Sequence, residues 1–125
     1  SKDYNNKYKG HFTAHNVSFI ENIGMLSLDN KALASVTYYG RSDKPQIGQR
    51  GFQVEIRTKA TAPFTKGQRI TTGDVCNTFR IQGTSAGETQ TITCTTPPTL
   101  AYTDYVTLQG LGYNFLMIAE IVLNV

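Results

Sequence analysis

Two cysteines, Cys76 and Cys94, are the first residues whose chemistry the sequence suggests. Each lies in or beside a strand-like segment, and a turn-rich stretch separates them, as is typical of a disulfide between neighbouring strands. Two buried free thiols are the alternative. A zinc site that adds His11 and His15 is less favoured, because the cysteines do not form the close pairs of zinc modules. We therefore expect a disulfide and an oxidising, extracellular setting.

Arg41 and Asp43 form a second candidate group, within the turn-rich stretch of residues 40–51. A guanidinium presents five donors in a rigid plane, so it can bridge adjacent hydroxyl groups of a ligand. Asp43, two residues away, could fix that plane through a salt bridge. The same spacing is also common in an ordinary surface ion pair. The pair alone leaves binding and plain surface chemistry open.

Signals for other functions are weak. The sequence has no Gly-x-Ser-x-Gly, no phosphate-binding G-x-x-x-x-G-K-[ST] and no paired carboxylates at a readable spacing. Its net charge of +3 comes from scattered cations without a run of like charge. The longest apolar segment, residues 115–125, is shorter than the ~20 residues that span a bilayer. We expect no enzyme, no nucleic-acid partner and no membrane insertion.

Alternating apolar and polar residues are the clearest pattern of secondary structure. Segment 51–57 predicts a strand with one core face and one wet face, the latter carrying Gln53, Glu55 and Arg57. Segments 76–82 and 89–94 alternate in the same way. Segments 32–39, 104–109 and 115–125 are rich in β-branched and aromatic residues, and the last is apolar on both faces, as in a central strand.

The fold class that follows is all-β. Gly, Pro, Ser and Asp fill the stretches between the predicted strands, and no helix signal competes. Short strands with turn-rich connections over 125 residues predict one antiparallel β-sandwich domain, residues 1–125, with functional loops at its ends. Composition alone would make the polar residues 1–10 a disordered tail.

The order of these segments resembles the fucose-binding F-type lectins, a branch of the discoidin-like fold. The resemblance covers roughly residues 3–125 and lies in VTYYGRSD (36–43), GFQVEI (51–56), Cys76, GETQTITC (87–94), PPTLAYTDYVTLQ (97–109) and FLMIAEIVLNV (115–125). It implies a discoidin-like jelly roll. The family's first strand is missing from this sequence, so the chain is trimmed, the fold is permuted, or another segment fills that edge.

The family's sugar motif is a histidine, then Arg-x-Asp, then a second basic residue. His15, Arg41, Asp43 and Arg50 are similar to it in order and approximate spacing, although Arg50 follows Asp43 later than usual and Lys44 could replace it. A sugar site also needs an apolar wall beside its hydrogen-bonding groups. The available walls are Tyr8, Phe12, Tyr38, Tyr39 and Pro45.

Two departures from the family concern the site. Lys44 and Pro45 stand where the family often has an adjacent cysteine pair that forms an apolar contact for the sugar. The outer disulfide is missing as well, with Thr13 and Ala119 at about its positions. The sequon that begins at Asn16 lies directly beside His15, and a glycan there would block the pocket.

The resemblance also implies a structural calcium ion. Asp3, Asn5 and Asn6 resemble remnants of the family's calcium loop, and Glu120 matches its late glutamate. These are oxygen ligands of the kind that Ca²⁺ prefers, but they are fewer than an all-protein site uses. Calcium is therefore an open expectation.

Taken together, the resemblance implies an extracellular lectin domain that recognises fucose or a related terminal monosaccharide on glycans. One sugar offers few contacts, so we expect weak affinity and multivalency through oligomers or tandem domains. The alternative is a discoidin-like adhesion module that binds protein or phospholipid through its end loops.

Overall fold

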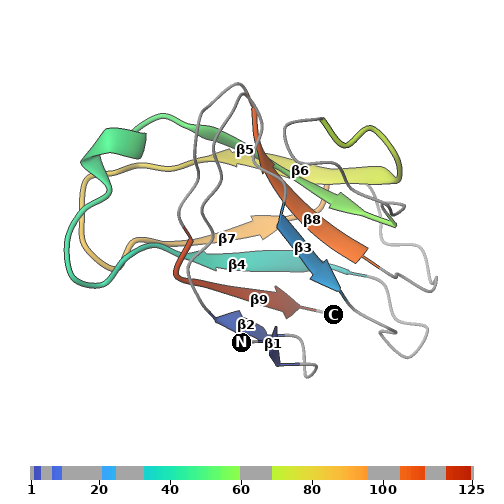
Figure 1. Cartoon of the computed structure of the whole chain (residues 1–125), viewed down its shortest axis with the longest axis horizontal. Helices are drawn as coiled ribbons and strands as arrows, with labels where there is room; N and C mark the ends of the chain where they lie inside the picture. Colours follow the sequence, from blue (N-terminus) through green and yellow to red (C-terminus); the bar gives the residue numbers. More distant parts are fainter. Residues whose placement is uncertain are drawn as a thin grey trace.

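The protein is described by a computed structural model that covers residues 2–3, 7–9, 21–24, 33–59, 69–95, 105–111 and 118–124 (Figure 1). Within these ranges the chain forms nine strands and one short 3-10 helix. The elements are β1 (Lys2–Asp3), β2 (Lys7–Lys9), β3 (Glu21–Gly24), β4 (Ser35–Tyr39), η1 (Ile47–Gln49), β5 (Gln53–Thr58), β6 (Asp74–Arg80), β7 (Thr89–Thr93), β8 (Tyr105–Gly110) and β9 (Glu120–Asn124).

The described strands make two antiparallel sheets that face each other (Figure 1). One has the order β1-β2-β9-β4-β7 and the other β3-β8-β5-β6, and every pairing is antiparallel. The predicted all-β sandwich is confirmed. β9 lies between β2 and β4, which confirms the central position expected for the last strand. The polar N-terminal segment supplies β1 and β2 at the edge beside β9, where composition alone favoured a tail.

Alternate residues of the strands point between the sheets and form the core. The most deeply buried are Val36 and Tyr38 of β4, Ile121 and Leu123 of β9, Val54 and Ile56 of β5, and Val106 and Leu108 of β8. The ring of Tyr38 packs against Phe79 of β6 with centroids 5.0 Å apart and planes tilted by 39°. This contact joins the two sheets, because β4 and β6 belong to different ones.

A disulfide closes one side of the sandwich. Cys76 on β6 is bonded to Cys94, which directly follows β7, with Cα atoms 4.3 Å apart. The predicted disulfide is confirmed. Consecutive strands carry the two cysteines, but these strands lie at the edges of different sheets, so the bond joins sheet to sheet. The backbone N–H of Thr95 donates to the Cys76 carbonyl at 2.8 Å beside it.

Two connections between the sheets lie at one end of the molecule. Residues 40–52 lead from β4 to β5 and contain η1, while residues 81–88 lead from β6 to β7. Both cross from one sheet to the other at the left of Figure 1. We call these two segments the crossover end. Arg41, Asp43 and Arg50 all fall within it.

Candidate functional site at the crossover end

The two connections of the crossover end are bonded directly to each other. The N–H of Gly40 donates to the Glu88 carbonyl at 2.8 Å, and the N–H of Gly51 donates to the Ile81 carbonyl at 2.8 Å. The N–H of Gly87 also donates to the carbonyl of Arg41. These backbone bonds tie the beginning and the end of the 40–52 connection to a neighbour, so the loop has a defined shape.

A buried glutamine sets the shape of the loop between those ties. The Oε1 atom of Gln46 accepts hydrogen bonds from the backbone N–H of Arg41 at 2.7 Å and from the Tyr38 hydroxyl at 3.4 Å. Its Nε2 atom donates to Oε1 of Gln49 at 3.0 Å, and both glutamines are buried. Side-chain amides of this kind replace the missing backbone pairing of a loop. They hold the segment from Arg41 to Gln49 as a closed turn.

Glu88 performs the same task for the 81–88 connection. Its buried carboxylate accepts from the N–H groups of Gln82 at 2.8 Å and Gly83 at 3.0 Å, and from Nε2 of Gln90 at 2.6 Å. Burial, together with the charge of Glu88, raises the pKa of the Tyr38 hydroxyl above its ordinary value, and the Gln46 bond only partly opposes this. The Tyr38 hydroxyl therefore stays protonated and donates a hydrogen bond to Gln46.

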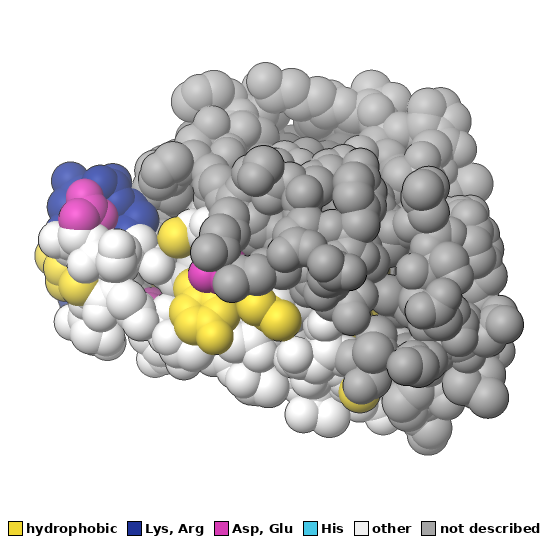
Figure 2. Space-filling model, turned by 90° about the horizontal axis from the view of Figure 1, so that it is seen from below, with side chains coloured by type: hydrophobic (Ala, Val, Ile, Leu, Met, Phe, Trp, Pro, Cys, Tyr) yellow, Lys and Arg dark blue, Asp and Glu magenta, His cyan; other side chains and the backbone are white. Residues whose placement is uncertain are grey.

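A pocket of about 320 Å³ opens on the outer side of this loop. Its lining residues are Arg41, Lys44, Pro45, Gln46, Ile47, Gly48 and Gln49. The volume lies at the lower end of the roughly 300–1,000 Å³ found for small-molecule sites, so it suits a ligand of about one sugar ring. Figure 2 shows cationic, acidic and hydrophobic side chains gathered at this end of the molecule.

Ile47 gives the pocket an apolar border. It is 64% exposed and is the large hydrophobic residue that the described part of the chain leaves in solvent. Pro45, also in the lining, is half-buried. Hydrogen-bond donors beside an apolar border can bind a ring that has both hydroxyl groups and an apolar face.

The Arg41 side chain is held by Asp43 in a two-point contact. Its Nε donates to Oδ1 of Asp43 at 2.8 Å, and its Nη2 donates to Oδ2. These hydrogen bonds lower the pKa of Asp43 and raise that of Arg41. The Arg41 side chain is 26% exposed and the residue lines the pocket, whereas Asp43 is absent from the lining. The expected salt bridge between them is thus present.

The other predicted sugar-binding residues differ in whether they line the pocket. Arg50 belongs to the same loop, but its Nη2 donates to the Gly83 carbonyl at 3.2 Å and the residue does not line the pocket. Lys44, its possible replacement, does line the pocket. His15 lies outside the described residues and stays a prediction. Tyr38, one of the expected aromatic walls, is fully buried in the core and cannot contact a ligand.

The predicted calcium ligands are only partly described. Asp3 ends β1 and Glu120 begins β9, with β2 between these two strands. Glu120 pairs with Tyr39, the residue that directly precedes the crossover end. Asn5 and Asn6 lie outside the described residues. Among the residues that are described, no three His, Cys, Asp or Glu side chains gather in a metal-binding group. Calcium remains a prediction.

Gln46, Gln49, Glu88 and Ile47 are site residues that the sequence does not single out. Glutamines have no spacing rule that marks them as loop supports, and their partners are contributed partly by other segments. Glu88 is a lone carboxylate in a Gly-rich turn, where the ordinary expectation is a solvated side chain. Ile47 carried no signal either, because its exposure is known only from the structure and a single exposed hydrophobic residue is common.

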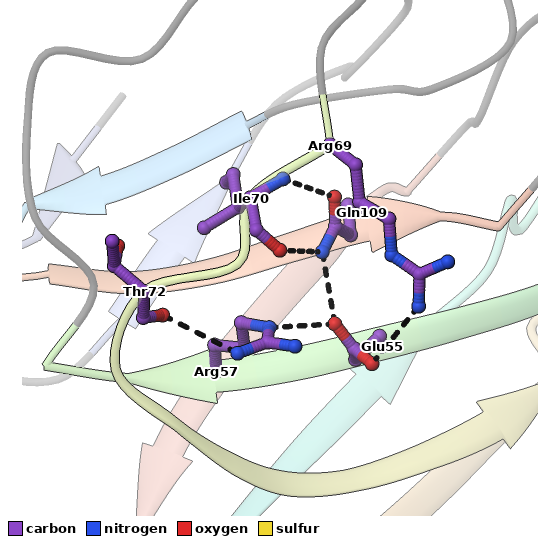
Figure 3. Close-up of polar contacts among 6 residues, drawn as sticks. All are labelled: Glu55, Arg57, Arg69, Ile70, Thr72 and Gln109. Atoms are coloured by element: carbon purple, nitrogen blue, oxygen red, sulfur yellow. Dashed lines mark hydrogen bonds and ion pairs between the residues drawn. The ribbon is translucent and has the colours of Figure 1, made fainter.

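A second polar cluster lies on the outer face of the four-stranded sheet (Figure 3). Oε1 of Glu55 accepts from Nε of Arg57 at 2.7 Å and from Nε2 of Gln109 at 2.9 Å, while Nη2 of Arg69 lies 3.6 Å from Oε2. Gln109 also exchanges two 2.9 Å hydrogen bonds with the backbone of Ile70. The cluster links β5 and β8 to the segment that precedes β6.

This cluster corrects the prediction of a wet face on β5. Glu55 is 6% exposed and is bonded by Arg57 and Gln109. Gln109 is fully buried, with the backbone of Ile70 hydrogen-bonded to it. Arg57 is half-buried and adds a bond to the Thr72 carbonyl at 3.4 Å. Carboxylate, guanidinium and amide groups satisfy one another here, so we interpret the cluster as structural.

Comparisons with known proteins leave the fold and the pocket as the basis for a functional argument. No family model, curated protein or solved structure matches the chain. The described residues also contain no helix that is long and apolar enough to cross a membrane. The likeness to F-type lectins therefore rests on the sequence segments named above.

Proposed function

We propose that this chain is an extracellular carbohydrate-binding domain that takes a terminal monosaccharide, fucose or a related sugar, in the pocket at the crossover end. One observation carries the proposal: Asp43 orients Arg41 at the wall of a sugar-sized pocket that Ile47 borders. A guanidinium held in one plane donates to adjacent hydroxyl groups without first losing its own freedom. The disulfide Cys76–Cys94 supports an extracellular location.

Binding of a single sugar will be weak, with a Kd of about 0.1–1 mM, because one ring makes few contacts. Physiological binding then depends on several copies of the domain acting together, by assembly or by repetition in a longer protein. His15 and a calcium ion held by Asp3, Asn5, Asn6 and Glu120 belong to the same proposal. They would add a hydrogen-bonding imidazole to the pocket and order the N-terminal segment.

A glycan array with the protein displayed at high density tests this function. We expect binding to a set of glycans that share one terminal monosaccharide, with terminal fucose the first to examine. A flat array, obtained with protein whose melting transition is intact, would contradict the proposal.

The exposed Ile47 favours one other function, an adhesion module that contacts protein or phospholipid through this loop. In that case Ile47→Ser would abolish adhesion to vesicles or cells. For sugar binding, the same substitution removes only an apolar border and should weaken the affinity several-fold.

A further inference from the structure

The wall of the pocket is positively charged. The described residues that line it include two cations, Arg41 and Lys44, and no acidic side chain. Lys44 is exposed at the tip of the turn, so its ammonium group can approach a ligand in the pocket.

Asp43 offsets only part of this charge. Its carboxylate is engaged by Nε and Nη2 of Arg41 and does not line the pocket. The hydrogen bond from Arg41 lowers its pKa most, and the charge of Lys44 acts in the same direction. Among Arg41, Asp43 and Lys44, the charged groups described in this turn, one carboxylate therefore stands beside two cations, an excess of one positive charge.

We infer that the pocket prefers an acidic sugar, a hexuronate whose ring carries a carboxylate, over the neutral sugar of the same ring. This inference rests on the proposed function. In such a complex the Lys44 ammonium pairs with the ligand carboxylate, Arg41 donates to ring hydroxyl groups, and Ile47 with Pro45 covers the apolar face of the ring. An anionic lipid surface would satisfy the same charge, but a concave site of about 320 Å³ matches a ring better than a flat surface.

The test compares D-galacturonate with D-galactose by isothermal titration, because these sugars differ only at carbon 6. We expect the acid to bind about 2- to 5-fold more tightly at low salt, the range of one exposed ion pair. At 1 M NaCl, where the Debye length is about 3 Å, the two affinities should approach each other. Equal affinities at low salt would overturn the preference while leaving the proposed function intact.

Lys44→Gln removes the charge and keeps most of the side-chain length, so it should make the affinities for the two sugars equal. Lys59→Gln is the matched control, because it removes the same charge at the other end of β5. It should retain the wild-type preference. A Lys44→Gln protein that still favours galacturonate would overturn the role of Lys44.

Two further outcomes separate the sugar from its rivals. Wild-type protein that binds no sugar would overturn the proposed function and the preference with it. Phosphatidylserine vesicles provide the second arm. Vesicle binding that Lys44→Gln abolishes, with no sugar bound, would assign this charge to a lipid surface and overturn the acidic-sugar preference.

Discussion

Arg41 owes its fixed orientation to its neighbours in the chain. Asp43 receives the Nε and Nη2 protons, and Gln46 receives the backbone N–H of the same residue. Side chain and backbone of Arg41 are thus held by different partners. For a weak ligand this matters, because ordering a free arginine on binding would cost about as much as one good hydrogen bond contributes.

The Arg41–Asp43 pair predicts how sugar affinity depends on pH. The pKa of Asp43 lies below its ordinary value of 3.8, so the pair is intact above that value and is lost as the pH falls through the lowered pKa. The part of the affinity that depends on this pair should be constant from neutral pH down to about pH 4 and fall below it, as measured by titration. Asp43→Asn should bind more weakly with no such fall, whereas an unchanged affinity in this variant would contradict the orienting role.

At this scale the sequence predicted the ion pair but not its supports. Two residues that are separated by one position can reach each other whatever the rest of the fold, so the Arg41–Asp43 pair could be predicted from the sequence alone. The bond of Gln46 to Tyr38 and the bond of Arg50 to Gly83 depend on tertiary placement of separate segments. Spacing alone therefore places Arg50 in the pocket, whereas its guanidinium bonds to Gly83 in the other connection.

The two connections of the crossover end act as one element. Gly83 has a φ of +67°, and a Cβ atom at this position would lie 2.7 Å from the Gln46 carbonyl oxygen and 3.0 Å from Cα of Arg50. The backbones of the two connections approach each other closely here. Only a glycine satisfies both the backbone angle and the space.

Gly83→Ala should therefore disturb the pocket, although Gly83 is not one of its lining residues. Gly87→Ala is the matched control, since its φ is +68° but no atom lies within 4 Å of the added Cβ. By urea denaturation the control should cost about 1–2 kcal/mol for the left-handed backbone. Gly83→Ala should cost a further 1–3 kcal/mol for the clash and should also weaken sugar binding. Equal effects of the two variants would show that the connections are not packed together as described.

Strands were predictable where residues alternate. Val54 and Ile56 in β5, and Ile92 in β7, follow a period of two and point into the core. β3 (Glu21–Gly24) was missed, because four residues with one isoleucine carry no pattern, and its pairing with β8 defines it as a strand. The burial of Glu55 does not follow from its own segment, because its partner Gln109 lies on β8 and is itself bonded to the backbone of Ile70.

The whole molecule is joined along one side by the disulfide and at one end by the two connections. The core residues of both sheets meet between these points, with Tyr38 and Phe79 in direct ring contact. The single domain over residues 1–125 stays a prediction. The loop that lines the pocket is tied to the core, since the core residue Tyr38 donates a hydrogen bond to Gln46.

Cys94→Ser should lower the stability of the sandwich by about 3 kcal/mol, because the disulfide restricts the unfolded chain over a sequence separation of 18 residues. Urea denaturation measures this loss under oxidising conditions. Wild-type protein treated with a reductant should lose a similar amount, and the variant should not respond to the reductant. A melting temperature equal to that of the wild type would argue against the stabilising role.

Sugar binding at Arg41 is the central claim, and backbone NMR titration tests it most directly. Fucose and D-galacturonate should shift amide signals of residues 40–49 in the wild type. They should do the same in the control Arg69→Ala, which replaces an arginine on the outer face of the four-stranded sheet. Arg41→Ala should lose these shifts while its melting temperature stays within about 2 °C of the wild type. Shifts that persist in Arg41→Ala, or that map away from the crossover end, would contradict the account.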